Sequence, residues 1–232
     1  CSDAGKVTAA IDAAVARGVP VMTFDGDAAG SRRFAYYGVD DEKLGEALMR
    51  DLAAQIGNKG PVAILAGNPD APNLRQRVDG VRKEAAKHPG ISIVDTFHHA
   101  ETVRDAADAV VGAQKAHPQI KGWAMVGGWP LFTPKLLSDM GTTPIKVVAV
   151  GALPAQLVYV EKGLAPVLIA QPTYMWGYES VQRIVDKVHL KKDVPEIMTM
   201  DVIRVTKSDL GPWARQLATW GFTVPDMYLK MP

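Results

Sequence analysis

Cysteine is almost absent from this chain. The 232 residues include one cysteine, Cys1, so no disulfide can form within the chain, and a structural zinc cluster is not expected. The position of Cys1 leaves two interpretations. It is either the lipidated cysteine that remains after signal removal in a bacterial lipoprotein, or a small apolar residue at a strand end. The second is favoured, because helix-forming sequence begins almost at once, without the polar linker that a lipid tether usually has.

A large net charge and a long apolar run are also lacking. The 26 lysines and arginines nearly balance the 25 aspartates and glutamates, which leaves a formal charge of +1. A chain with so little excess positive charge is not expected to bind nucleic acid or a membrane surface. No apolar segment approaches the roughly 18 residues of a membrane-spanning helix, and no export signal is recognisable. With 47% hydrophobic and 22% charged residues, the composition is that of a soluble globular protein.

Motifs of the common enzyme classes are missing as well. The chain contains no GxGxxG, P-loop, HExxH or GxSxG pattern, so it lacks the usual residues for dinucleotide binding, phosphate cradling, zinc proteolysis and serine hydrolysis. His98 and His99 are adjacent at the end of an expected strand, where neighbouring side chains point in opposite directions, and no third metal ligand accompanies them. We therefore expect no catalytic residues, no metal and no cofactor.

What the chain does contain is organised around residues 18–45, GVPVMTFDGDAAGSRRFAYYGVDDEKLG. Val19–Phe24 is a short apolar run bounded by a proline and a glycine-containing loop, which is typical of a buried parallel strand, and Asp25 follows it directly. Ligands of open α/β sheets bind just beyond the carboxyl ends of the strands. We therefore expect Asp25 to face a ligand, and residues 36–38 to cross from one domain to the next.

Strands and helices are expected to alternate along the whole chain. Apolar residues recur at helical spacing in several segments, which are separated by short apolar runs that end at glycine or proline. The strands expected after the first are Pro61–Ala66, Ile91–Phe97, Gly122–Val126, Ile145–Val150, Val167–Ala170 and Ile197–Val205. The helices expected among the later ones are Val103–Ala116, Leu131–Met140, Leu153–Lys162, Tyr174–Val188 and Leu210–Trp220. This alternation predicts an α/β fold with parallel sheets flanked by helices.

The first strand has too few neighbours close to it in the sequence. The strands from Pro61 to Ala170 are numerous enough to form a sheet of their own. The strand that ends before Asp25 is separated from them by the crossing and has few neighbours with which to pair. Parallel strands need cover on both faces. We therefore expect the later segment Gln171–Val188 to return to the first strand, and further sequence to precede Cys1.

Three segments, in order, resemble the periplasmic sugar-binding proteins of the ribose-binding type. The stretch quoted above is similar to that family's strand, loop, crossing and helix; NLRQRVDGVRKEA is similar to its cleft-facing helix; KVVAVGALPAQLVYVEKGLAPVLIAQPTYMWG is similar to its last strands and helices. The resemblance covers roughly residues 5 to 205. It implies the type I periplasmic-binding-protein fold, which LacI-type effector domains share: two lobes, each a parallel sheet flanked by helices, with a ligand in the cleft between them.

The resemblance also implies the domain boundaries. Residues 1–37 and 171–196 would form the amino-terminal lobe, and residues 38–170 and 197–232 would form the carboxy-terminal lobe. The family's amino-terminal lobe begins with strands and helices that this sequence does not contain, so we expect this lobe to be incomplete. The part not contained here includes a loop that contacts the sugar in the family.

Three polar residues match residues of the family's cleft, and a fourth, Asn68, is a weaker candidate at the same edge. Asp25 matches an aspartate that accepts hydrogen bonds from ligand hydroxyls, and its alternative role is to cap a loop amide. Arg77 matches an arginine that donates to two ligand oxygens, and its alternative role is a surface ion pair. Gln171 lies at a crossing between the lobes, where it either contacts ligand or bridges the hinge. Asn68 lies at the same edge and is either a ligand contact or a loop cap.

Two glycines stand where the family has polar side chains. Gly127 replaces an asparagine and Gly151 replaces an aspartate, so two polar sugar contacts are absent and the backbone can approach the ligand closely. Trp129 either stacks on a sugar face or packs on the helix that it precedes. Tyr174 and Trp176 either line the cleft or pack in the core, and the core is favoured. The ligand is accordingly expected to be less hydroxylated, or held more by stacking and backbone, than ribose.

Three classes of function remain open. The preferred one is the solute receptor of an ABC importer, which binds a sugar or sugar-like polyol and docks on an ABC permease. Such a receptor is periplasmic or, with a lipid anchor, extracellular. The second is the effector domain of a LacI-type transcriptional regulator, although the sequence contains no helix-turn-helix. The third is a small-molecule enzyme on a related sheet, for which no catalytic residues are recognisable.

Overall fold

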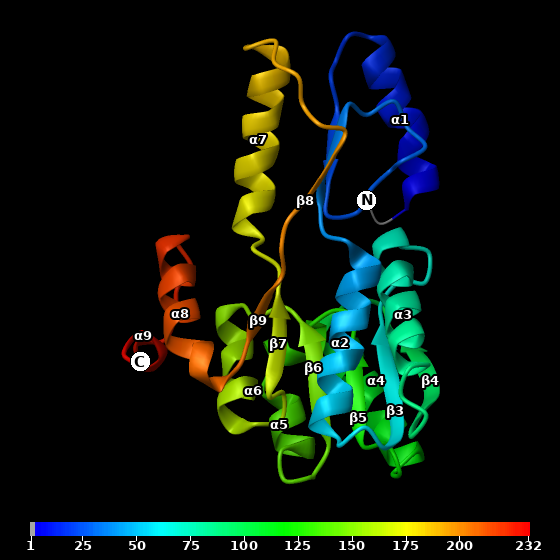
Figure 1. Cartoon of the computed structure of the whole chain (residues 1–232), viewed down its shortest axis with the longest axis vertical. Coiled ribbons are helices and arrows are strands. Elements are labelled where there is room, and N and C mark those ends of the chain that lie inside the picture. The colour runs from blue at the N-terminus through cyan, green and yellow to red at the C-terminus, as the bar shows by residue number, and fades with distance from the viewer. Residues whose placement is uncertain (1–2) are drawn as a thin grey trace.

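The chain folds into two parts, each built on its own β-sheet (Figure 1). The computed structural model describes residues 3–232, so Cys1 lies outside the described residues. The strands are β1 (Met22–Phe24), β2 (Ala35–Gly38), β3 (Gly60–Ala66), β4 (Ile91–His98), β5 (Gly122–Met125), β6 (Lys146–Val150), β7 (Val167–Ala170), β8 (Ile197–Thr199) and β9 (Ile203–Val205). The larger sheet has the order β4-β3-β5-β6-β7-β9, and the smaller one has the order β1-β2-β8. Every pairing is parallel except that of β7 with β9.

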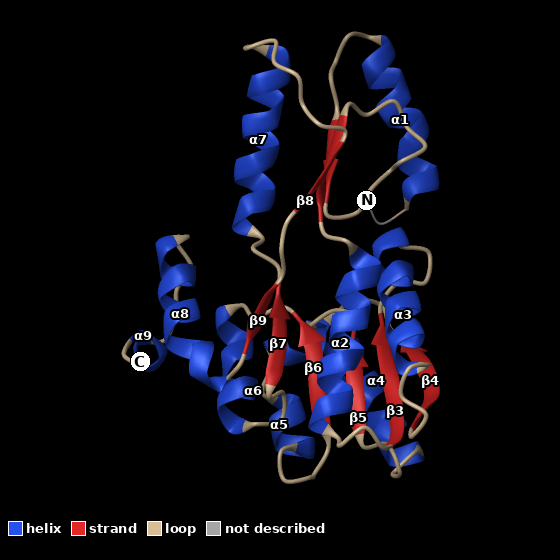
Figure 2. Ribbon diagram, viewed as in Figure 1, coloured by secondary structure: helices blue, strands red, loops and turns tan. Residues whose placement is uncertain are grey.

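Helices flank the larger sheet and stand beside the smaller one (Figure 2). The α-helices are α1 (Ala4–Ala16), α2 (Asp41–Gln55), α3 (Pro72–Ala85), α4 (Val103–Ala116), α5 (Lys135–Met140), α6 (Leu157–Lys162), α7 (Tyr174–Val188), α8 (Leu210–Thr219) and α9 (Asp226–Leu229). Three short 3₁₀ turns, η1 (Trp129–Phe132), η2 (Pro154–Gln156) and η3 (Lys207–Asp209), precede α5, α6 and α8. The expected α/β class, with parallel sheets flanked by helices, is therefore confirmed.

The larger sheet is buried on both faces. Along β3, Val62 and Ile64 belong to an apolar cluster with α2 and α3, whereas Ala63 and Leu65 belong to a cluster with α4 and α8. Successive side chains of a strand point to opposite faces, so this division shows that helices cover both sides. Burial of each valine, leucine or isoleucine contributes about 1.5–3 kcal/mol. The larger part therefore has the core of a stable α/β domain.

Two glycines allow α2 and α3 to pack closely. A Cβ atom on Gly45 of α2 would collide with the carbonyl oxygen of Arg77, and one on Gly80 of α3 would collide with that of Glu42. Asp40 caps α2, because its side chain accepts a hydrogen bond from an amide of the first turn. This contact between the helices brings the start of α2 next to Arg77, at the edge of the sheet that faces the smaller part.

The smaller part is thinly covered. α7 packs against β1 and β2, and the ring centroids of Phe24 and Trp176 are 6.2 Å apart, which confirms the expected return of residues 171–188 to the first strand. Among the described residues, α1 buries no side chain, and α7 buries only Ser180 and Asp186. The apolar stripe of α7 is exposed instead, and its members are Tyr174, Tyr178, Val181, Val185 and Val188.

The last expected strand is two strands in the structure. One strand is expected over Ile197–Val205, whereas β8 pairs with β2 in the smaller sheet and β9 pairs with β7 in the larger one. The chain crosses between the sheets at residues 200–202. Residues 197–199 therefore pair in the smaller sheet, and β2 extends that sheet to Gly38. Both pieces are extended and short, so the local pattern does not reveal the crossing.

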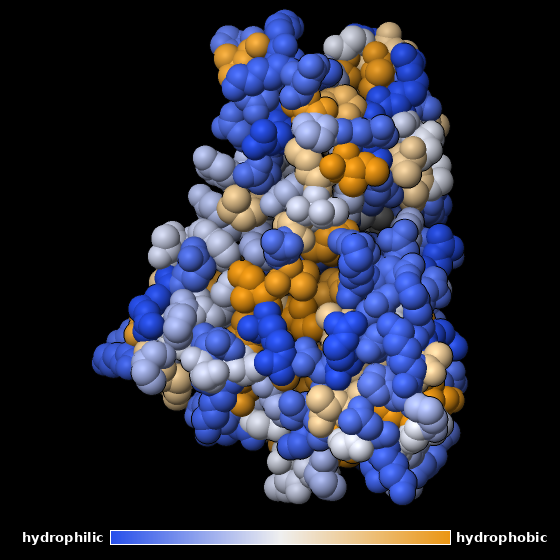
Figure 3. Space-filling view, viewed as in Figure 1, coloured by the Kyte–Doolittle hydropathy of each residue, from blue (hydrophilic) through white to orange (hydrophobic). Residues whose placement is uncertain are grey.

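The surface is mainly polar in the view of Figure 3, which shows one large apolar area and several smaller ones. The large area lies on the larger part, between α2 and α8, below the segments that cross to the smaller part. No helix within residues 3–232 is long and apolar enough to span a lipid bilayer.

Candidate functional site

A cavity of about 440 Å³ lies between the two parts of the molecule. The smaller part and the crossing after β7 contribute Asp25, Gln171, Thr173 and Trp176 to its lining. The larger part contributes the start of α3 and the loops that follow β4, β5 and β6. These loops lie at the carboxyl ends of parallel strands, where open α/β sheets bind ligands. The volume is in the range of small-molecule sites.

Asp25 is fixed at the cavity by its backbone. Its φ angle is +59°, in the left-handed region, and its amide donates to the carbonyl oxygen of Tyr37 over 3.1 Å. The Tyr36 hydroxyl donates to the Asp25 carbonyl oxygen over 2.8 Å. These bonds tie the end of β1 to β2 and leave the carboxylate 34% exposed in the cavity. Burial raises the pKa of Asp25, and the nearby Arg77 guanidinium opposes that rise.

Arg77 connects three elements beneath the cavity. Its Nε donates to Asp41 Oδ1 over 2.7 Å and its Nη1 donates to the Val126 carbonyl oxygen over 3.0 Å. Its Nη2 lies 3.7 Å from Asp25 Oδ1 and has no hydrogen-bond partner within the described chain. Burial raises the pKa of Asp41 to about 6, even with Arg77 beside it. Arg77 is thus a structural ion-pair partner that keeps one donor for the cavity.

Three buried donor atoms of the lining lack a hydrogen-bond partner in the described structure. They are Arg77 Nη2, Gln171 Nε2 and Trp176 Nε1. An unsatisfied buried donor costs about 1–3 kcal/mol. A ligand whose acceptor atoms bond to these three donors would remove that cost, which favours its binding. Together with the Asp25 carboxylate, they form a polar side that suits a ligand with several oxygen atoms.

The opposite side of the cavity is apolar. A Cβ atom on Gly127 would collide with the ring of Trp129, and Gly151, with φ +113°, would place one 2.8 Å from Gln156 Oε1. The Gln156 amide is already occupied, since Oε1 accepts from the Leu153 amide over 2.8 Å and Nε2 donates to the Gly128 carbonyl oxygen over 2.9 Å. The side chains of Trp129 and Gln156 therefore fill the space that larger residues at the two glycines would need.

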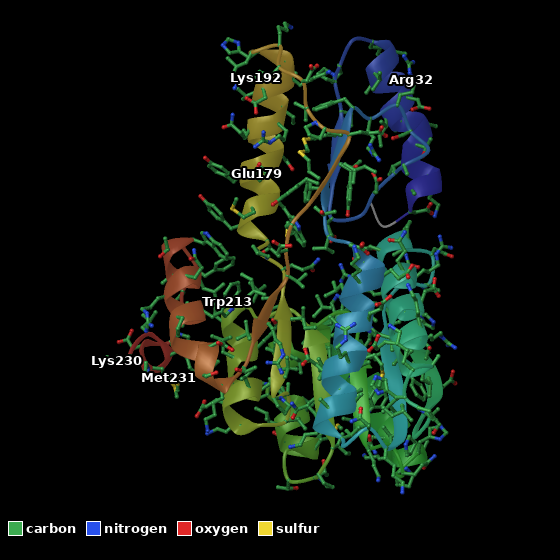
Figure 4. All side chains as sticks on the ribbon, viewed as in Figure 1. Arg32, Glu179, Lys192, Trp213, Lys230 and Met231 are labelled. Atoms are coloured by element: carbon green, nitrogen blue, oxygen red, sulfur yellow. The ribbon has the colours of Figure 1, made fainter. Side chains whose placement is uncertain are left out.

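Two further aromatic residues complete this side, Phe132 and Trp213. Trp213, labelled in Figure 4, comes from α8 and is 5% exposed. Its Nε1 donates to the Ala152 carbonyl oxygen over 2.7 Å, so the one polar atom of its side chain already has a protein partner. The ring of Trp129 is held edge-on by His99, with 4.8 Å between the centroids. Trp129 thus packs on protein and also lines the cavity.

Six of the seven residues expected to contact a ligand line this one cavity. They are Asp25, Arg77, Gln171, Trp129, Gly127 and Gly151. Asn68 lies outside it and lines a separate pocket of about 260 Å³. Its Oδ1 accepts from the Asp70 amide over 2.9 Å, which is the loop-cap role that the sequence left as its alternative. The surface ion pair that was the alternative role of Arg77 is not formed, and Arg77 pairs instead with the buried Asp41.

Several other residues of the lining were not selected from the sequence. Trp213 was expected only as part of the last helix, and Gln156 only as part of another. Trp176, favoured as core, lines the cavity and also contacts Phe24. Glu101 lines the cavity as well, with φ +60°, and its Oε1 accepts from the Asn68 amide over 2.8 Å. None carries a local motif, because it is tertiary packing that brings the loops after β4 and β6 and the helices α7 and α8 together at the cleft.

The two adjacent histidines do not form a metal site. His98 Nδ1 lies 2.8 Å from the Gly67 carbonyl oxygen, whereas the His99 ring packs on Trp129. Across residues 3–232, no group of three or more histidine, cysteine or acidic side chains is arranged to hold a metal ion.

The paired sheets, the crossings and the cleft between them define a class of two-lobed binding protein. The chain belongs to the family of periplasmic binding protein domains, whose model matches residues 1–192. This family and the similar structures are binding proteins rather than enzymes. A comparison with curated protein sequences gives no match.

Solved structures of sugar-binding proteins are similar to this chain. One is an ABC-transporter solute-binding protein from Burkholderia graminis C4D1M in complex with D-arabinose, with TM-score 0.84 and 26% identity over 89% of this chain and 73% of that one. Another is GanP, a glucose-galactose binding protein from Geobacillus stearothermophilus, with TM-score 0.83 and 27% identity over 90% of this chain and 75% of that one. A third, the fructose-binding periplasmic domain of a hybrid two-component system, shares the fold at TM-score 0.81 and 20% identity over 93% and 72%.

Proposed function

We propose that this chain is the solute-binding receptor of an ABC importer and that it binds a sugar or sugar-like polyol in the cleft between its two parts. The observation that carries the proposal is the set of three buried donors without a hydrogen-bond partner, on residues that line one cavity together with Asp25. Hydroxyl and ring oxygens of a sugar accept from such donors, and its hydroxyls donate to a carboxylate. Sugar-bound and sugar-binding relatives at 26% and 27% identity support the same substrate class.

Each residue of the site then has a distinct role. Asp25 accepts from ligand hydroxyls, while Arg77 Nη2 and Gln171 donate to ligand oxygens. Trp129 presents its ring to the C–H face of the sugar, as aromatic side chains do. Gly127 and Gly151 let the backbone approach the ligand closely.

Closure of the cleft would follow from the three crossings. The chain passes between the parts after β2, after β7 and between β8 and β9. A few residues at such crossings can absorb the rotation of a hinge. In the closed form, surfaces of both parts lie side by side, and an ABC permease would recognise them together. This role places the protein in the periplasm or, with a lipid anchor, at the outer surface of the cell.

The test is a thermal-shift screen of the whole natural protein against pentoses, hexoses and polyols, followed by calorimetry. A ligand that binds the native state raises the melting temperature. The Asp25→Asn variant should lose most of the shift, whereas Asp70→Asn, outside the cavity, should retain it. If no sugar or polyol shifts a cooperatively folded protein, the proposed ligand class is wrong. For the importer role, the sugar-loaded protein should stimulate ATP hydrolysis by its reconstituted permease, and a LacI-type regulator would not.

A further inference from the structure

The cavity between the two parts has a polar side and an apolar side, and this asymmetry constrains the ligand beyond its general class. The unpartnered donors Arg77 Nη2, Gln171 Nε2 and Trp176 Nε1 and the Asp25 carboxylate all come from α3, the end of β1 or the segment after β7. The loops after β5 and β6 and the helix α8 contribute the other side. The ligand therefore meets two chemically different surfaces at once.

Two polar side chains of the apolar side are already occupied by protein partners, and Phe132 and Leu153 carry no polar side-chain atom. Gln156 is 1% exposed, and its side-chain amide accepts a hydrogen bond from the Leu153 backbone amide and donates one to the Gly128 carbonyl oxygen. The Trp213 indole donates to the Ala152 carbonyl oxygen. What these loops present to a ligand is the ring of Trp129, the rings of Phe132 and Trp213, the Leu153 side chain and glycine backbone.

A hydroxyl group pressed against the side chains of Phe132 and Leu153 would lose its water and gain no hydrogen-bond partner from them. Burying a hydroxyl without a hydrogen bond is unfavourable, whereas burying a methyl or methylene group against aromatic and aliphatic side chains is favourable. A polar side chain at position 127 or 151 would not fit without movement of its neighbours. The ring of Trp129 occupies the space beside Gly127, and the amide of Gln156 occupies the space beside Gly151.

We propose that the ligand is a deoxy sugar, whose methyl or methylene edge lies against Trp129, Phe132 and Leu153 and whose remaining oxygens lie against Arg77, Gln171 and Trp176. This inference rests on the proposed function, because it specifies the sugar for the same cavity. The two proposals can be tested separately, because each deoxy sugar has a fully hydroxylated parent of the same ring geometry. The proposed function allows either member of such a pair to bind more tightly, whereas this inference requires the deoxy member to do so.

Matched pairs of sugars test the inference by calorimetry on the whole natural protein. The pairs are L-rhamnose with L-mannose, L-fucose with L-galactose, D-quinovose with D-glucose, and 2-deoxy-D-ribose with D-ribose. In at least one pair the deoxy member should bind roughly tenfold or more tightly than its parent, because one unpaired hydroxyl is avoided. Parents that bind as tightly as their deoxy partners, or more tightly, would overturn the inference and leave the proposed function intact. If no sugar binds the folded protein, both fall.

Two variants of the apolar side sharpen the test. Leu153→Gln adds a polar group of similar length and should move the ratio of affinities within the pair toward one, whereas the apolar control Leu153→Met should keep the wild-type ratio. Phe132→Tyr adds a single hydroxyl at a second position and should act in the same direction as Leu153→Gln. Ratios that stay unchanged in both polar variants, measured on folded protein, would contradict contact between the apolar side and the deoxy edge.

Discussion

The guanidinium of Arg77 and the carboxylate of Asp41 form a buried ion pair at the base of the cavity, with 2.7 Å between Nε and Oδ1. Their side chains are 5% and 4% exposed. Arg77 therefore has two roles, since it joins α3 to α2 and to the end of β5 while its Nη2 remains available to a ligand. Loss of ligand binding on mutation of Arg77 would by itself not separate these roles.

Arg77→Ala should destabilise the protein by about 3–5 kcal/mol, because it leaves the Asp41 carboxylate buried and uncompensated. Urea unfolding measures the change. The control is Arg75→Ala, since Arg75 lies on the same helix, is exposed, and should change stability by no more than about 0.5 kcal/mol. Equal effects of the two substitutions would contradict the structural role of the ion pair.

The stability contributed by Asp41 should depend on pH. Burial raises its pKa to about 6 from an ordinary 3.8, so the folded state binds a proton more readily than the unfolded state. The contribution of Asp41 to the free energy of unfolding is therefore fully present below the unfolded pKa and is lost as the pH rises through about 6. Relative to Asp41→Asn, the wild-type free energy of unfolding should fall by an amount on the order of 1 to 3 kcal/mol between pH 4 and pH 7. Parallel pH profiles for the two proteins would show that the pKa of Asp41 is not raised.

Asp25→Asn should weaken ligand binding by roughly 1–3 kcal/mol, because a charged acceptor is lost. Burial raises the pKa of Asp25, so the wild-type affinity should begin to fall at a higher pH than for an ordinary aspartate as the solution is acidified. Calorimetry over a pH series measures this fall. The variant should show a flatter profile, and a wild-type affinity independent of pH would argue against Asp25 as a ligand contact.

Gly127→Ala should reduce ligand affinity, because the new methyl group occupies the position of the Trp129 ring and forces it to move. Overpacking of this kind costs about 1–3 kcal/mol of stability. The matched control is Gly112→Ala in α4, where a Cβ atom meets open space and the better helix propensity of alanine should stabilise the protein by about 0.5–1 kcal/mol. Fluorescence titration and urea unfolding of both variants would reveal whether the Trp129 ring must remain in place.

The apolar stripe of α7 should tolerate polar substitution. Val181 is 62% exposed, so Val181→Ser should change the free energy of unfolding by no more than about 0.5 kcal/mol. Leu48→Ala, a substitution at a fully buried position of α2, should cost about 2–5 kcal/mol. If the two substitutions cost the same in the whole natural protein, the stripe is covered there by a further part of the molecule.

Much of the fold could be predicted because its signals are local. The leucines of α2 recur at helical spacing, and the apolar runs of β3, β5 and β6 end at glycine, so element type follows from nearby residues. The division of residues 197–205 between two sheets could not be predicted, because extended backbone suits either sheet and only its partners, β2 and β7, distinguish the halves.

By itself, the sequence determined the α/β class, the position of Asp25 after a strand and the absence of polar side chains at Gly127 and Gly151. Only the tertiary structure decided that the Arg77 side chain is shared between Asp41 and the cavity, that Asn68 lies elsewhere, and that Trp213 closes the apolar side. The physical reason is distance along the chain. Such contacts join residues tens of positions apart, and their geometry is set by how α2, α3, α7 and α8 pack on the sheets rather than by local spacing.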